Sequence, residues 1–279
     1  MAAVYKGPRA MPVPEIPEKP TWTDISANPQ FIEYIKDATK LPFAYVKETA
    51  AIYSADLKET FCYLLQGKTR TGRTDLLKLL AACAKAKGAD VCIFDPNEIQ
   101  LKRFAEKLGV KYASTPREIY DYSAELLKIF KGRNAIKREM LENGAEDDEI
   151  FERMSKEQPV FIFVSSFAAF LKTVHTAHED CGMMNGFFEN ILEKGRLHNI
   201  YFVFDSNMED IPSMLGRRIY TIVTGYKTGV QLGGLAGQKA FDTSNISFVE
   251  QGKSYRPGTG MAFGINGGEK IIIPSSKGV

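Results

Sequence analysis

The chain has 279 residues, of which 44% are hydrophobic and 25% charged, and this composition is ordinary for a globular protein with one large α/β domain or two small ones. Its 36 basic and 34 acidic side chains leave a net charge of +2, which gives no electrostatic footprint for nucleic acid or for an anionic membrane. Because no apolar run approaches the roughly 18 residues of a membrane span and the N-terminus has no signal-peptide core, we expect this chain to fold in the cytosol.

Residues 1–20 form a proline-rich segment, with four prolines between positions 11 and 20. Proline fixes an extended backbone and lacks the N–H group that a helix or a central strand needs. We interpret 1–20 as an inter-domain linker, which implies that the native polypeptide begins before Met1. We expect 21–279 to form a single domain.

Apolar runs bounded by turn residues predict strands, and apolar residues at helical spacing predict helices between them. The predicted strands cover 41–46, 50–57, 60–67, 90–95, 159–167, 199–207 and 218–225. The predicted helices cover 28–38, 74–87, 98–107, 116 into the 140s, and 183–195. Strands that are apolar on both faces and alternate with helices favour an α/β fold with a mainly parallel sheet and helices on both faces. The tail from Gly225 is rich in glycine and short β-like runs.

The segment 67–74 has the spacing of a phosphate-binding loop, G-x-x-x-x-G-K-[S/T], with one departure. Arg73 stands where the pattern has lysine, and arginine does not replace the compact ammonium at a tightly shaped phosphate site. One interpretation is residual nucleotide binding, and the other is a strand–turn–helix that only preserves the fold. The candidate residues for binding are Gly67, Lys68, Thr69, Arg70, Thr71, Gly72, Arg73, Thr74 and Asn207.

The strand at 160–164 and the residues after it resemble a known family, the FtsK/SpoIIIE class of ATPase domains. Ser165 and Ser166 stand where that family has an acidic pair, a matching Phe-Ala follows, and Ala169 replaces a further acid. Asn207 stands at the polar amide position of the family's sensor strand. The resemblance implies a RecA-like P-loop NTPase fold with a short β-rich C-terminal region.

The resemblance covers most of residues 40–275 and fits one branch best, because of the proline-rich entry, the degraded motifs and the "PGTGMAF" segment near the end. That branch is the third, C-terminal ATPase domain of the type VII secretion membrane ATPases (EssC/EccC). It implies neighbouring ATPase domains in one polypeptide, on the cytoplasmic side of the bacterial cell membrane, in an assembly that could be hexameric. It also implies WXG100-type secretion substrates, whose C-terminal signals dock on a late domain.

The two serines weaken the enzymatic expectation. In the family the first acid of the pair holds the Mg²⁺ shell and the second polarises the attacking water, and a hydroxyl carries no charge for either task. We therefore expect no catalytic residue, with Arg73, Ser165 and Ser166 as degenerate positions, and at most weak binding of ATP and Mg²⁺.

Two alternatives stay open at this stage. A slow but genuine ATPase would need other acids, and Asp95, Asp205 and Asp210 lie nearest to strand ends. A DNA-translocating module, as found among relatives of this fold, is disfavoured because no stripe of Lys and Arg follows a phosphate track.

The remaining clusters are expected to be structural. His175, His178 and Cys181 have a helical spacing, but a zinc site wants a fourth ligand and none lies nearby, so we expect no metal. A second phosphate site in the glycine-rich segment 234–241 is not expected. Arg196, Arg217 and Arg218 could act in trans at a subunit edge or lie on a solvated surface. The four cysteines, at 62, 83, 92 and 181, are expected to be reduced thiols.

Overall fold

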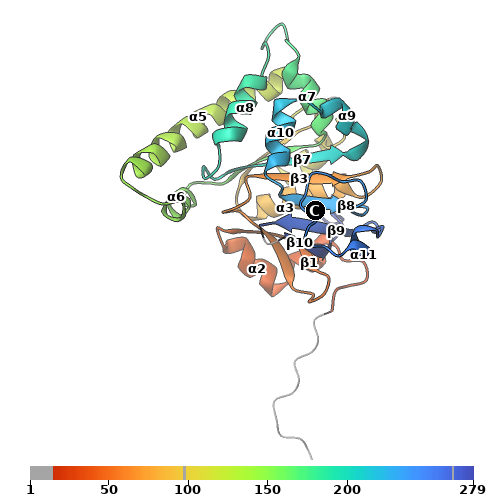
Figure 1. The fold of residues 1–279 in the computed structure, drawn as a ribbon. Coiled ribbons are helices and arrows are strands. Elements are labelled where there is room, and N and C mark those ends of the chain that lie inside the picture. Colours follow the sequence, from red (N-terminus) through yellow and green to blue (C-terminus); the bar gives the residue numbers. More distant parts are fainter. Residues whose placement is uncertain (1–14, 97–98, 266) are drawn as a thin grey trace, which may run out of the picture.

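The computed structural model describes residues 15–96, 99–265 and 267–279, and within these ranges ten strands form one sheet in the order β2-β1-β10-β9-β8-β3-β7-β6-β4-β5 (Figure 1). The strands are β1 Lys40–Val46, β2 Ile52–Asp56, β3 Cys62–Gly67, β4 Asp90–Phe94, β5 Lys111–Ala113, β6 Val160–Val164, β7 Ile200–Asn207, β8 Gly229–Leu232, β9 Thr259–Gly264 and β10 Gly267–Ile272. From β8 to β5 all neighbours are parallel, and from β2 to β8 all are antiparallel. The predicted α/β fold with a β-rich C-terminal region is confirmed. The predicted linker at 1–20 lies outside the described residues as far as residue 14.

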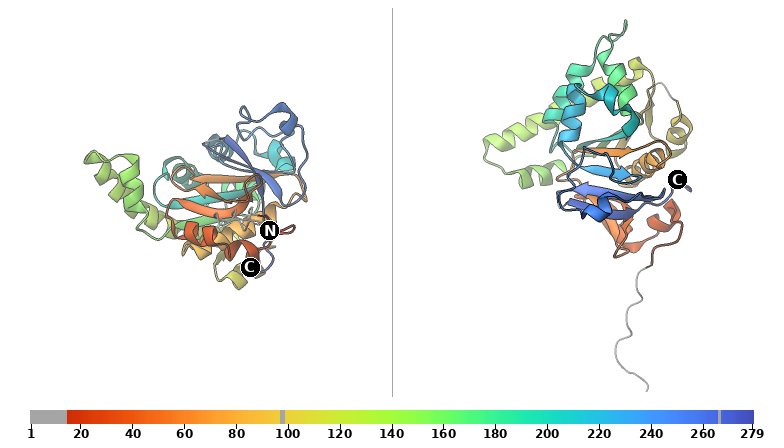
Figure 2. Two further views of the ribbon diagram at one scale, coloured as in Figure 1. Left: turned by 90° about the horizontal axis from the view of Figure 1, so that it is seen from below. Right: turned by 45° about the vertical axis from the view of Figure 1, so that its right-hand side comes forward.

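Helices cover both faces of the sheet (Figures 1 and 2). They are α1 Trp22–Ser26, α2 Pro29–Lys36, α3 Arg73–Ala86, α4 Lys102–Leu108, α5 Pro116–Glu142, α6 Asp147–Met154, α7 Phe167–His175, α8 Asn185–Lys194, the short 3₁₀ helix η1 Met208–Asp210, α9 Ile211–Met214, α10 Arg218–Gly225 and α11 Phe248–Gln251. Figures 1 and 2 show α5 reaching beyond the sheet, with α6 folded back near its far end. Within the described residues, no helix combines the length and the apolar character needed to cross a bilayer.

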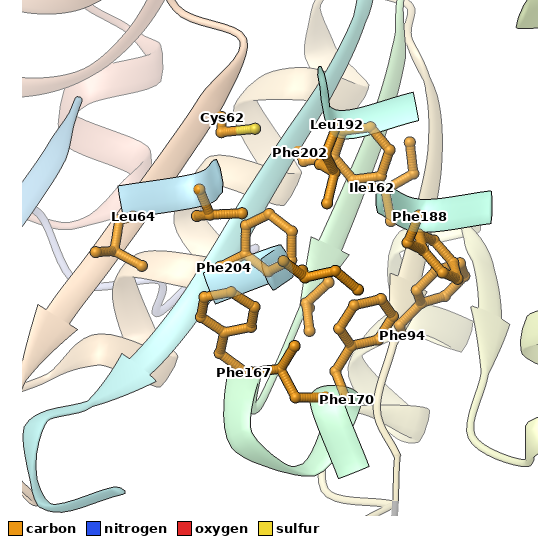
Figure 3. Close-up of a cluster of buried hydrophobic side chains, with 14 of the residues drawn as sticks. Cys62, Leu64, Phe94, Ile162, Phe167, Phe170, Phe188, Leu192, Phe202 and Phe204 are labelled. Carbon is orange, nitrogen blue, oxygen red and sulfur yellow. The ribbon is translucent and has the colours of Figure 1, made fainter. Parts of the chain in front are cut away.

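The central strands send alternate side chains to the two faces. On one face Leu64, Phe202 and Phe204 pack against Phe170 of α7 and Phe188 of α8 (Figure 3). On the other face the buried leucines of α3 pack against the odd-numbered side chains of the same strands. This alternation fixes which side chains of each strand can reach α3, because the side-chain period of a strand is two residues.

The prediction of a strand at 218–225 is wrong, since these residues form the helix α10. Ile219 and Val223 are buried four residues apart on one side of the helix, which packs against α8 and β3. The β-branched residues of this segment suit a strand, but packing on the sheet face overrides that local preference. The next parallel partner of β3 is β8 instead.

The long helix α5 is fixed to the sheet by a buried arginine. The Arg133 guanidinium donates hydrogen bonds to the carbonyl oxygens of His198 (2.8 Å), Asn199 (2.9 Å) and Gln158 (2.6 Å). These carbonyls lie just before β6 and β7. A cation that bonds three backbone carbonyls therefore joins α5 to the amino ends of two central strands.

The same region makes stability depend on pH. His198 is buried, and its burial, with nearby Lys137, lowers the pKa of the imidazole to about 4. Since an unfolded histidine titrates near 6.5, the unfolded state binds more protons between these two values, and stability is lost as the pH falls through that window. We expect a loss of about 3 kcal/mol between pH 7 and pH 4 from this residue.

Urea unfolding at several pH values checks this expectation. The variant His198→Asn should have a flatter dependence between pH 6.5 and pH 4 than the unaltered chain. Equal slopes for the two proteins would rule out His198 as the source.

Candidate functional site

The carboxyl ends of β3, β4, β6 and β7 meet at one edge of the sheet, which is where open α/β sheets bind ligands. A cavity of about 310 Å³ lies there, beside the amino end of α3. Its lining residues are Thr69, Arg70, Arg73, Thr74, Asp95, Gln100, Leu101, Ser165, Ser166, Asp205, Asn207 and Asp210. The structure thus brings together three sets of predicted residues: the degenerate motif positions, half of the loop 67–74, and the three acids that could replace the missing carboxylates.

The loop between β3 and α3 contacts its neighbours through Thr71. Gly72 precedes α3 with a left-handed backbone (φ +97°), which favours glycine. The hydroxyl of Thr71 donates to the carbonyl of Lys68 (2.8 Å). The side chain of Thr71 lies between two glycines, Gly67 and Gly233. A Cβ atom on Gly67 would lie 2.5 Å from Thr71 Oγ1, and a Cβ atom on Gly233 would lie 2.7 Å from Thr71 Cγ2, so neither position has room for a side chain. The loop keeps the glycine turn of a phosphate-binding loop, but Thr71 anchors it to the sheet.

Arg73 makes an ion pair inside the protein. Its Nη1 bonds Oδ1 of Asp205, a residue 132 positions later in the sequence, on the α3 face of β7. The two side chains are only 15% and 5% exposed. The cation at the lysine position of the pattern therefore has an internal carboxylate partner.

The two serines that replace the acidic pair have structural roles. Ser165 Oγ donates a 2.5 Å hydrogen bond to Oδ1 of Asp95, which follows β4 and is fully buried. The other oxygen of Asp95 accepts from the N–H of Leu101 (2.9 Å) and from the hydroxyl of Tyr112 (3.0 Å). Ser166 caps α7, where its hydroxyl accepts the N–H of Ala169 at 3.3 Å. Both oxygens of Asp95 and the hydroxyl oxygen of Ser166 thus accept hydrogen bonds from within the chain.

A small network joins the loop to the end of β7. Thr69 Oγ1 donates to Oε2 of Glu209 (2.7 Å), and Nδ2 of Asn207 donates to the same oxygen (3.3 Å). These hydrogen bonds lower the pKa of Glu209. In return, the backbone N–H of Glu209 donates to Oδ1 of Asn207 (3.2 Å). Sequence reasoning missed Glu209, although an Asn that caps the turn after β7 is a local signal for it.

The other predicted clusters do not join this site. His175 ends α7, whereas His178 and Cys181 lie beyond that helix, and the rings of His175 and His178 bond the carbonyls of Leu171 (2.9 Å) and Thr173 (2.8 Å). Metal-capable groups of three or more His, Cys, Asp or Glu do not occur in the part of the chain that the structure describes.

Two of the three arginines that could act in trans or lie on a solvated surface form ion pairs within the chain. Arg196 pairs with Glu59 and Asp147, and Arg218 pairs with Glu193. The cysteines are free thiols, three of them buried and Cys181 partly exposed.

A second hollow of about 440 Å³ adjoins the loop at Thr71, Gly72 and Asp75. Much of its lining is apolar, including Leu232, Pro257 and Ile273. Charged residues, among them Asp75 and Arg256, also line it.

No protein-family model matches the sequence, and no curated protein matches it. Solved structures do match the fold. The cytoplasmic domain of EssC has a TM-score of 0.78 at 14% identity over 96% of this chain and 49% of that chain. EssC (ATPases 2 and 3) from Geobacillus thermodenitrificans has a TM-score of 0.72 at 14% identity over 96% and 46%. Thermomonospora curvata EccC (ATPases 2 and 3), in complex with a signal sequence peptide, has a TM-score of 0.66 at 16% identity over 97% and 46%.

At these identities the likeness establishes the fold, which is that of the P-loop ATPase domains of EssC and EccC. This chain spans about half the length of each of these three structures.

Proposed function

We propose that this chain is a degenerate ATPase domain of a bacterial type VII protein secretion motor, in which it recognises or regulates WXG100-type substrate signals with little or no ATP hydrolysis. The observation that carries the proposal is the ion pair between Arg73 and Asp205 in the place where a nucleotide's phosphates would lie.

The pair opposes phosphate binding in two ways. A ligand phosphate must displace the carboxylate of Asp205 from Arg73, and the released carboxylate would then lie beside the phosphates with the same sign of charge. At the Mg²⁺ positions, Ser165 and Ser166 are already hydrogen-bonded and carry no charge. Loss of a general base alone costs about 10²–10⁴ in rate, and the loss of a metal anchor adds to it.

The similar structures support two of the partners in this proposal. Two of those chains contain ATPases 2 and 3 together, which supports contacts between this domain and neighbouring ATPase domains of one polypeptide. The EccC structure contains a signal sequence peptide, which supports docking of a substrate signal on this class of domain. In this proposal the parent protein lies at the cytoplasmic side of the cell membrane and could assemble as a hexamer.

Calorimetric titration of the chain with a C-terminal peptide of a WXG100 protein encoded beside it tests the receptor role. The expected result is saturable binding in the absence of nucleotide, with no heat from a scrambled peptide of the same composition. Equal heats from both peptides would contradict the receptor role.

A second candidate function is slow but genuine ATP binding and hydrolysis. Two observations favour it: Asp95, Asp205 and Asp210 all line the 310 Å³ cavity, and the 440 Å³ hollow beside Gly72 could take a nucleobase. Titration with ATP–Mg²⁺ separates the two candidates. We expect at most millimolar affinity, about −4 kcal/mol, whereas micromolar, Mg²⁺-dependent binding would favour the second candidate. A DNA translocase module is less favoured, because the net charge of the chain is only +2.

A further inference from the structure

Three polar side chains lie in one row beneath the site, where the fold requires apolar packing. Ser206 of β7, Gln66 of β3 and Gln231 of β8 are register neighbours on three adjacent strands, with Gln66 in the middle. All three are completely buried. By the alternation of each strand they point to the face opposite α3, next to Leu64 and Phe204.

Four atoms of this row have no hydrogen-bond partner among the described residues. They are Ser206 Oγ, Gln66 Oε1, Gln66 Nε2 and Gln231 Oε1. A buried polar atom without a partner costs about 1–3 kcal/mol, so four of them in one place would cost a large part of a domain's stability. The four atoms therefore need one another, or internal water.

The unpaired atoms are complementary in chemistry. The hydroxyl of Ser206 can donate to Oε1 of Gln66, and Nε2 of Gln66 can donate to Oε1 of Gln231. Neighbouring strands of a sheet lie about 4.7–4.9 Å apart, so one internal water or a rotation of the amide groups can join a serine and two glutamines at the same register. The far end is already fixed, since Nε2 of Gln231 donates to the carbonyl of Leu232 (3.1 Å) and to Sδ of Met208 (3.3 Å).

We propose that Ser206, Gln66 and Gln231 form a buried hydrogen-bonded chain, completed where needed by internal water. This chain positions the loop and the end of β7, which line the 310 Å³ cavity, and the glycine segment after β8, against which the loop packs. Gln66 directly precedes Gly67 and the loop, and Ser206 lies between Asp205 and Asn207. Gln231 precedes Leu232, which lies against Gly67, and Gly233, which lies against Thr71. The chain thus joins the loop, the end of β7 and the glycine segment after β8. The proposal holds whether or not a nucleotide binds.

Replacement of the middle residue tests the chain. Gln66→Met keeps the length of the side chain and removes both polar groups, so it leaves Ser206 and Gln231 without their partner. We expect a fall in Tm of about 3–6 °C. Ser206→Ala and Gln231→Met should each lower Tm alone but add little in the Gln66→Met background, because residues of one network are not additive.

Hydrogen–deuterium exchange distinguishes a network from a local packing defect, because a local defect would change exchange rates only near residue 66. Gln66→Met should speed exchange in all three segments, 67–72, 205–210 and 231–234. The control is Gln158→Met at the opposite end of the sheet, where the amide donates to the carbonyl of Gly88 (3.0 Å), and it should change exchange only there. A rise in Tm with Gln66→Met, additive losses for the three variants, or exchange changes confined to β3 would overturn the proposal.

Discussion

Arg73→Met is expected to lower the free energy of unfolding by about 3–5 kcal/mol, because it leaves the carboxylate of Asp205 without its cation in a site that is 5% exposed. A cation whose only role is to bind a ligand, with no carboxylate partner in the folded chain, would give little loss of stability when it is replaced. Urea unfolding followed by circular dichroism measures the difference, with the midpoint and the slope reported separately.

Two further variants make this result specific. Arg70→Met removes the same charge from an exposed position of the same loop and should change stability by no more than about 0.5 kcal/mol. In an Asp205→Asn background, Arg73→Met should cost only about 1 kcal/mol, because no buried charge is then left behind. If Arg73→Met still lowered the free energy of unfolding by several kcal/mol in the Asp205→Asn background, the ion pair would not be the cause of the loss.

Ser165→Asp, which restores an acid to the first position of the degenerate pair, is expected to destabilise the protein rather than to repair it. The new carboxylate would stand at hydrogen-bond distance from Asp95, which is fully buried, and one of the two must take up a proton. Holding a proton at pH 7 on a carboxyl that ordinarily titrates near 4 costs about 3–4 kcal/mol. Differential scanning calorimetry at pH 7 should show the corresponding fall in Tm.

The pH dependence identifies the cause. In the Ser165→Asp variant, one carboxyl of the pair has a raised pKa in the folded state. The folded variant then binds more protons than the unfolded chain above about pH 4, so its loss of stability shrinks as the pH falls toward that value. Ser165→Asn, an uncharged control of the same shape, should have no such dependence. Mg²⁺ should recover part of the lost Tm, because two carboxylates can share a divalent cation. A penalty that is equal at pH 4.5 and pH 7 would contradict this explanation.

The elements that could be predicted are those with a clear periodic pattern of apolar residues in the sequence. The strands at 60–67, 159–167 and 199–207 were predictable because each is an apolar run ended by polar or turn residues. The helix at 74–87 follows a glycine turn, and its leucines recur on the buried side. The helix at 218–225 could not be predicted, because its β-branched residues suit a strand and its packing against α8 and β3 is not a local signal.

The sequence could predict which residues lie in the candidate site, but not which of them pair with one another. Parallel strands end at one edge, so the loop, the serines and the three acids could be expected to lie near one another. The partner of Arg73 could not be read from the sequence, because Asp205 lies 132 residues away and its choice depends on the face of β7 that meets α3. The Ser206–Gln66–Gln231 row depends in the same way on strand register, which no local pattern encodes.

The central claim is that the chain keeps the fold of a nucleotide motor while its own side chains occupy the phosphate site. Steady-state release of inorganic phosphate from ATP and Mg²⁺ by the purified chain tests it most directly, with activity followed across a gel-filtration peak to exclude a contaminating enzyme. The account predicts release that does not follow the protein peak. Release that follows the peak, requires Mg²⁺ and proceeds at about 1 s⁻¹ or faster, as ordinary enzymes do, would contradict it.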